Sequence, residues 1–309
     1  MLFPEKLKKG DTIGVIAPAS PSKSKTKKLL TYELEKIEQE LNKLGYKVKF
    51  GKTCYLRYKG YLAGEDEFRV KDIENMFLDK DVNGILCLRG GYGTLRIIDK
   101  INYNIIKENP KVFIGYSDIT ALHIAFNQIA NLVTYHGIMG LNFLHYDKYT
   151  FDSFSNILSM EDEIIIKNPE DEELHTLVQG KANGITVGGN LAVIISTLGT
   201  RYEIDTKNKI LFIEEIGENI YKIDRMLTQL ELSNKLNDCC GIIFGDFKKC
   251  RKDNEDDYDL YELLFEKIKK YNKPCLCNLK VGHCTSSNSI LLGGNCYLDA
   301  TNKSIKFVK

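Results

Sequence analysis

One serine in this 309-residue chain is placed where a buried strand should pass directly into a helix. Ser117 ends the apolar, β-branched run 111–117, and apolar residues recur at helical spacing over 121–129. A serine in such a turn exposes its Oγ beside backbone N–H groups and the positive end of the helix, as in a nucleophile elbow. The second glycine of the GxSxG elbow motif is absent, because Ile119 occupies its place. From these residues alone, Ser117 is either a nucleophile or a helix N-cap, and Asp118 could help to cap the same helix.

A serine nucleophile needs a base, usually a histidine that a carboxylate orients, and the chain has five histidines. His283 lies in a loop after a predicted strand and is the best placed base. His136 also follows a strand, so it could line the same cleft. His123 falls inside the helix after the serine, where a packed core histidine is expected. The other two lie in a polar stretch and are expected to be solvated: His145 and His175.

Two adjacent glutamates lie near the end of another predicted strand, KILFIEEIGE at 209–218. Successive side chains of a strand point to opposite faces, so only one of Glu214 and Glu215 can reach a given histidine. The other is expected to be solvated or to cap a helix. Strand alternation by itself does not say which of the two orients the base.

A glycine-rich loop, RGGYG at 89–93, follows a further buried strand. It lacks the third glycine of the dinucleotide motif GxGxxG, because Arg96 occupies that place, and the chain has no GxxxxGK[ST] phosphate loop. Its glycines still allow a ligand to approach the backbone closely, with peptide N–H groups free to donate. In open α/β sheets, ligands bind at the carboxyl ends of the strands, which is where all these segments fall.

The composition argues against several classes of partner. Lys and Arg total 43 against 42 Asp and Glu, a formal charge of +1, so the basic surplus typical of nucleic-acid-binding proteins is missing. The N-terminal residues form no apolar signal segment, and no run approaches the roughly 18 apolar residues of a membrane helix. The nine cysteines form no CxxC pair, which indicates a reducing compartment and no metal site. We therefore expect a cytoplasmic protein without nucleic-acid or membrane partners.

Apolar runs typical of buried strands alternate with helical patterns, which predicts an α/β fold with right-handed crossovers. We predict a doubly wound, mostly parallel N-terminal domain over 1–150 and a smaller C-terminal α/β domain over 183–309. The polar stretch 151–182 is predicted to be a linker. The active site would lie between the two domains, because both contribute residues that could do chemistry.

Five segments of the chain resemble motifs of peptidase family S66, which comprises the LD-carboxypeptidases and the related microcin C self-immunity hydrolases. They occur in the family's order, and the resemblance covers nearly the whole chain, from GDTIGVIAPASP near the N-terminus to the C-terminal hairpin. The segments are RGGYG, GYSD, GGNLAVI at 188–194, ILFIEEIGENIYKIDRML at 210–227 and VGHCT at 281–285.

The resemblance implies a catalytic triad of Ser117, Glu214 and His283, because the family's glutamate corresponds to the first of the adjacent pair. It implies an oxyanion hole made by the backbone N–H groups of Gly91 and Asp118. The implied reaction is amide hydrolysis by acyl transfer, which needs no metal and no cofactor. A class I amidotransferase-like enzyme would instead carry a cysteine at the elbow, and a non-catalytic binding module would not need all three triad residues.

The substrate that the resemblance implies is a murein tetrapeptide, which loses its terminal D-alanine during cell-wall recycling. We assign Arg89, Gly90 and Tyr92 to substrate binding, since loop amides or Arg89 could hold the terminal carboxylate. For Tyr92 the alternative is a packing role without contact to the substrate. The alternative substrates are aminoacyl-sulfamoyl adenylates or aminoacyl nucleotides, the substrates of the immunity hydrolases. Family members are commonly dimers, so a homodimer is expected.

Overall fold

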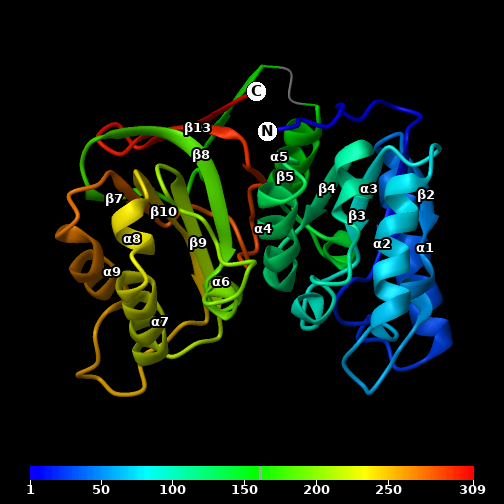
Figure 1. The fold of residues 1–309 in the computed structure, drawn as a ribbon, viewed down its shortest axis with the longest axis horizontal. Helices are drawn as coiled ribbons and strands as arrows, with labels where there is room; N and C mark the ends of the chain where they lie inside the picture. The colour runs from blue at the N-terminus through cyan, green and yellow to red at the C-terminus, as the bar shows by residue number, and fades with distance from the viewer. Residues whose placement is uncertain (160–161) are drawn as a thin grey trace.

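The computed structural model describes residues 1–159 and 162–309, and it contains two β-sheets with helices packed around them (Figure 1). The first sheet has the order β2-β1-β3-β4-β5-β12. Its first five strands are parallel, while β12 pairs antiparallel with β5. The strands are β1 (Thr12–Ile16), β2 (Lys47–Phe50), β3 (Gly84–Cys87), β4 (Val112–Gly115), β5 (Thr134–His136) and β12 (Ile290–Leu292).

Helices cover both faces of the first sheet, as the uninterrupted apolar strands require. Residues that alternate along β3 and β4 belong to two separate cores, with Leu86 in one and Ile85 in the other. Helix α1 (Lys27–Lys43) buries Ile37 in the first core, and α2 (Asp66–Leu78) buries Phe77 in the second. The remaining helices of this region are α3 (Tyr103–Glu108), α4 (Thr120–Gln128) and α5 (Lys148–Leu158). The expected doubly wound arrangement is therefore confirmed.

The second sheet has the order β6-β14-β13-β8-β9-β10-β11-β7. Strands β8 to β11 are parallel, and antiparallel strands extend the sheet on both sides. The strands are β6 (Glu163–Ile166), β7 (His175–Val178), β8 (Lys181–Asn190), β9 (Ile210–Ile216), β10 (Gly241–Lys248), β11 (Cys275–Cys277), β13 (Asn295–Asp299) and β14 (Ser304–Val308). Its helices are α6 (Leu191–Thr197), α7 (Ile220–Leu232), α8 (Lys235–Asp238) and α9 (Leu260–Lys269).

The stretch 151–182, predicted to be a linker, instead contributes to the folded core. It contains most of α5 and the strands β6 and β7, which form the two edges of the second sheet. The charged residues of this stretch are concentrated in the connection 167–173 between the two strands, so its composition resembles that of a loop. Near its C-terminal end, the chain returns from the second sheet to the first, where β12 pairs with β5. Helices α4 and α6 lie side by side where the two sheets meet (Figure 1).

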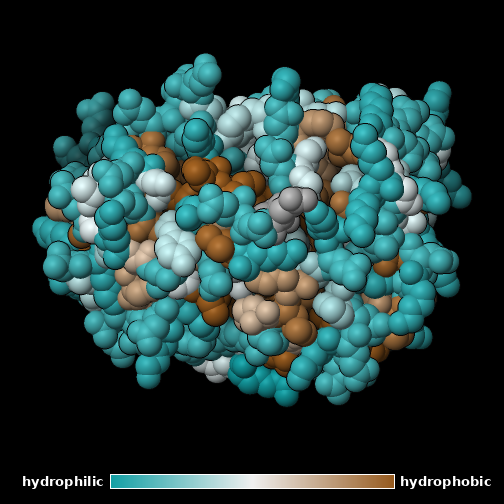
Figure 2. All heavy atoms as spheres, turned by 90° about the horizontal axis from the view of Figure 1, so that it is seen from above, coloured by the Kyte–Doolittle hydropathy of each residue, from teal (hydrophilic) through white to brown (hydrophobic). Residues whose placement is uncertain are grey.

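Both chain ends lie at the upper edge of the molecule in Figure 1. The face seen from that side is mostly hydrophilic, with apolar side chains gathered in separate patches (Figure 2). Within residues 1–159 and 162–309, every helix is too short or too polar to cross a lipid bilayer.

Candidate active site

Ser117 lies two residues beyond the end of β4, at the carboxyl edge of the first sheet, where a single 3₁₀ turn (Ser117–Ile119) leads into α4. Its φ is +65°, a value that few residues other than glycine adopt. Residues held in such strained backbone conformations cluster at active sites and ligand-binding sites. The loop after β3 packs directly against it, because a Cβ on Gly90 would lie 3.0 Å from Ser117 Oγ. A strained strand-to-helix turn therefore lies at the place of the predicted elbow, without the second glycine of the elbow motif.

Glu214 and His283 form a hydrogen-bonded pair, with 2.7 Å between Glu214 Oε2 and His283 Nδ1. Glu214 is fully buried near the end of β9, and the His283 side chain is 14% exposed in the loop after β11. Gly282 has a φ of +121°, and a Cβ at this position would lie 2.6 Å from the carboxylate oxygen. Glycine thus allows the histidine loop to approach the glutamate closely. The pair can hold the imidazole with Nδ1 as donor and leave Nε2 available as a base.

Tyr116 connects this pair to the serine elbow, although the sequence analysis assigns it no role. Its ring lies edge-on to the His283 ring, with 4.9 Å between the ring centroids. Its hydroxyl accepts a hydrogen bond of 3.3 Å from Asn142 Nδ2, and burial raises its pKa, which keeps the phenol neutral. Since Tyr116 directly precedes Ser117, its packing brings His283 next to the elbow. A tyrosine before the serine gives no sequence signal for this contact, which depends on the two sheets meeting.

Asp118 holds the glycine-rich loop instead of capping α4. Its buried carboxylate accepts a hydrogen bond of 2.9 Å from the backbone N–H of Thr94. The hydroxyl of Thr94 donates a second bond, of 2.6 Å, to the backbone carbonyl of Asp118. Burial raises the pKa of Asp118. Arg69, also fully buried, donates to the carbonyls of Pro18 and Gly93 at 2.8 Å each. These bonds fix the loop that contains Gly91 against the elbow.

Two further residues assigned to substrate binding lie on this loop. Arg89 is partly buried and donates to the carbonyl of Pro21 at 3.2 Å, and burial lowers its pKa. Among the described residues, no carboxylate lies within ion-pair distance of its guanidinium. Tyr92 is half exposed and packs against Tyr61, with ring centroids 5.7 Å apart.

The remaining histidines divide between the core and the surface. His123 Nε2 donates to the carbonyl of Gly115 at 2.9 Å, and burial lowers the pKa of this core histidine to about 4. His136 is fully buried beside Tyr116 and does not line a cleft; burial lowers its pKa well below the usual value. The end of β5 at His136 is covered by Phe212 of β9 in the second sheet, and the sequence around His136 gives no sign of this contact. The other two, as expected, are exposed: His145 and His175.

Glu215 caps a helix. Its Oε2 accepts a hydrogen bond of 2.8 Å from the backbone N–H of Ala192 in α6, and its Oε1 accepts one of 2.9 Å from Asn190 Nδ2. Burial raises the pKa of Glu215, while its hydrogen bonds oppose that shift. Of the adjacent glutamates, Glu214 is therefore the one that contacts His283. In the described chain, no three His, Cys, Asp or Glu side chains gather as metal ligands would.

Comparison with known proteins identifies the family to which this chain belongs. Residues 13–137 match the LD-carboxypeptidase N-terminal domain of peptidase family S66, and residues 183–298 match the corresponding C-terminal domain. The chain is 41% identical over 307 residues to the probable murein peptide carboxypeptidase of Bacillus subtilis, covering 97% of this chain and 92% of that protein. The chain therefore belongs to peptidase family S66, the LD-carboxypeptidases.

Two solved structures share the whole architecture. The muramoyltetrapeptide carboxypeptidase of Oxalobacter formigenes superposes with a TM-score of 0.82 at 25% identity, covering 96% of this chain and 97% of that one. The microcin C7 self-immunity protein MccF superposes with a TM-score of 0.89 at 23% identity, covering 99% of this chain and 98% of that one. The second likeness extends to the fold alone.

Proposed function

We propose that this protein is a serine-type LD-carboxypeptidase that releases the terminal D-alanine from murein tetrapeptides. The observation that carries the proposal is the hydrogen-bonded Glu214–His283 pair, whose imidazole packs against Tyr116, the residue before the strained turn at Ser117. The 41% identity to a probable murein peptide carboxypeptidase supports the choice of substrate.

In the proposed reaction, Ser117 Oγ attacks the carbonyl carbon of the L-residue that precedes D-alanine, while His283 takes its proton. The negative charge on the carbonyl oxygen is met by the backbone N–H groups of Gly91 and Asp118. When the C–N bond breaks, His283 returns the proton to the amine of the leaving D-alanine. A water then attacks the acyl-enzyme with His283 again as base, which frees the tripeptide. Throughout, Glu214 holds the imidazole and stabilises its charged form.

Arg89 is the proposed partner of the substrate's terminal carboxylate. Its guanidinium is partly desolvated. Within the described residues, it donates a hydrogen bond to one group, the backbone carbonyl of Pro21. An incoming carboxylate would supply a charge-assisted, bidentate partner of the kind that arginine prefers. Gly90 and Tyr92, on the same loop, would line this subsite. We expect Arg89→Met to raise KM for the tetrapeptide more than it lowers kcat.

The competing substrate class comes from the likeness to MccF, structures of which contain adenosine monophosphate or aspartyl sulfamoyl adenosine. At 23% identity, that likeness concerns the fold. The decisive experiment compares kcat/KM for three compounds: a murein tetrapeptide, the same peptide with an amidated C-terminus, and an aminoacyl-sulfamoyl adenosine. The proposal predicts a preference for the free tetrapeptide. A tenfold preference for the adenosine conjugate, or unchanged cleavage of the amidated peptide, would overturn it.

We also propose a cytoplasmic location and a homodimer. The nine cysteines are all free thiols, six of them buried, as is usual in a reducing compartment. Light scattering after size exclusion, on the purified chain, measures the mass in solution. A mass near twice 35.2 kDa supports the dimer, and one near 35.2 kDa contradicts it.

A further inference from the structure

The two halves of the proposed catalytic site come from different sheets. Ser117 follows β4 of the first sheet, whereas Glu214 lies on β9 of the second and His283 follows β11. Acyl transfer needs the hydroxyl and the imidazole in near-attack geometry, and a misplacement of about 1 Å can cost about 100-fold in rate. Contacts that hold the elbow against the second sheet therefore affect the rate directly.

One such contact joins the beginning of α4 to the end of β8. Thr120, three residues after Ser117, is fully buried, and its Oγ1 accepts a hydrogen bond of 3.0 Å from the backbone N–H of Asn190. Gly189 packs so closely that a Cβ there would collide with Thr120 Oγ1. The two elements thus touch without an intervening side chain that could adapt.

Asn190 is in turn fixed to the strand that carries Glu214. In the pairing of β8 with β9, Asn190 lies opposite Glu214. Its side chain caps α6 by accepting a hydrogen bond of 3.2 Å from the backbone N–H of Val193 in the first turn, and it donates one of 2.9 Å to Glu215. Asn190 and Glu215 are both at least 95% buried. Buried, fully paired polar groups of this kind are rigid, because each lost partner leaves an unsatisfied group.

We propose that Thr120 and Asn190 form an interdomain contact that sets the position of Ser117 relative to His283 and Glu214, with Glu215 holding Asn190 in place. The inference rests on the proposed function and adds positioning residues to it. Neither Thr120 nor Asn190 is required to touch the substrate. Their loss should slow the reaction of Ser117 while leaving substrate binding in place.

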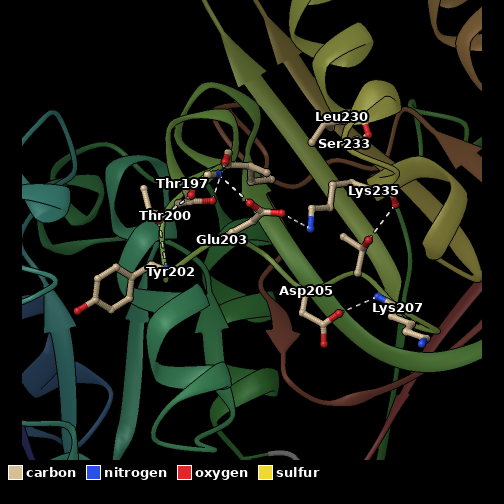
Figure 3. Close-up of polar contacts among 12 residues, drawn as sticks. Thr197, Thr200, Tyr202, Glu203, Asp205, Lys207, Leu230, Ser233 and Lys235 are labelled. Atoms are coloured by element: carbon tan, nitrogen blue, oxygen red, sulfur yellow. Dashed lines mark hydrogen bonds and ion pairs between the residues drawn. The ribbon is translucent and has the colours of Figure 1, made fainter.

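The other end of α4 offers a matched control. There Gln128 Nε2 donates to the carbonyl of Glu203 at 3.1 Å, and Gln128 Oε1 accepts from the backbone N–H of Asp205 at 2.7 Å. The loop that carries both residues is braced by an ion pair of 2.6 Å between Glu203 and Lys235 (Figure 3). Gln128→Met removes an interdomain contact of the same helix, but at the end remote from Ser117.

The test compares Thr120→Val, Thr120→Ser and Gln128→Met by thermal unfolding, by kcat and KM on a murein tetrapeptide, and by the rate at which a fluorophosphonate labels Ser117. We expect Thr120→Val to lower kcat and the labelling rate about tenfold or more while KM changes less than about twofold. Thr120→Ser keeps the hydroxyl and should restore both rates, and Gln128→Met should retain them at a lower melting temperature. Wild-type rates in Thr120→Val, or an equal loss in all three variants, would overturn the inference.

If Thr120→Val does not fold, Asn190→Ala tests the anchor on Glu215 in the same assays, and unchanged rates would overturn the inference. Failure of the proposed function gives a different result. A wild-type protein that labels at Ser117 but does not cleave the tetrapeptide overturns the murein substrate and leaves the positioning test intact through labelling. A wild-type protein that neither labels nor cleaves overturns both.

Discussion

Replacing the two adjacent glutamates by glutamine, one at a time, should separate turnover from stability. One variant should lose turnover, and the other should lose stability. The carboxylate of Glu214 accepts a hydrogen bond of 2.7 Å from His283 Nδ1. A glutamine there either presents an N–H to Nδ1, which selects the wrong tautomer, or presents an oxygen without the charge that stabilises the imidazolium. The corresponding change in a Ser–His–Asp triad costs about 10⁴ in kcat, or about 5.4 kcal/mol.

Glu215→Gln disturbs a different set of bonds. The carboxylate accepts three N–H groups, from Asn190 Nδ2, Ala192 and Ile216, at 2.8–2.9 Å. Whichever way a glutamine amide turns, its NH₂ group faces at least one of these donors. Such an unsatisfied, buried group costs about 1–3 kcal/mol of unfolding free energy. A glutamine whose oxygen takes the Oε1 position keeps the bonds to Asn190 and Ile216 and loses the one to Ala192. Turnover should therefore fall far less than in Glu214→Gln, because both the anchor of Asn190 and the bond to His283 are kept.

The assay measures kcat/KM on a murein tetrapeptide and unfolding by urea for both variants and the wild type. We expect Glu214→Gln to lose turnover at nearly wild-type stability and Glu215→Gln to lose stability with most of the turnover retained. If Glu215→Gln loses as much turnover as Glu214→Gln, the orienting carboxylate has been misassigned.

Two further predictions concern metal dependence and pH. EDTA should leave kcat/KM unchanged, because the proposed acyl transfer uses His283 and backbone N–H groups where a metalloenzyme uses a Lewis acid; activity that is lost on chelation and restored by a metal would contradict the mechanism. Hydrogen bonds from Lys36, Lys43 and Tyr146 hold the pKa of Glu40 at about 2, below its ordinary value of 4.5. The contribution of Glu40 to the free energy of unfolding is therefore complete above about pH 4.5 and lost as the pH falls toward 2. Urea unfolding should show a larger difference in this free energy between the wild type and Glu40→Gln at pH 7 than at pH 3. A difference that does not depend on pH would refute this assignment.

The sequence predicts the parts of the fold that depend on local pattern. Buried strands such as β3 and β4 are uninterrupted apolar runs that end in turn residues, and this pattern places Ser117 at the end of a strand. Strand alternation correctly separated Glu214 from Glu215, and one of them does cap a helix. These features are set by a few neighbouring residues, so they are visible without the fold.

Pairings between distant segments could not be predicted in this way. Strands β6 and β7 are four residues long and partly exposed, so the sequence pattern around them predicts a linker. The return of β12 to the first sheet depends on pairing with β5, over 150 residues earlier in the chain. The contact between Thr120 and Asn190 has the same origin, because a buried threonine and an N-cap asparagine each have an ordinary local role.

The most direct test of the central claim is the release of D-alanine by the wild type and by Ser117→Ala. Each protein is incubated with a defined murein tetrapeptide, and the products are identified by mass spectrometry and by chirality of the freed amino acid. We expect the wild type to yield the tripeptide and D-alanine, and a folded Ser117→Ala to lose several powers of ten in rate. Release of D-alanine by Ser117→Ala at close to the wild-type rate would contradict the account.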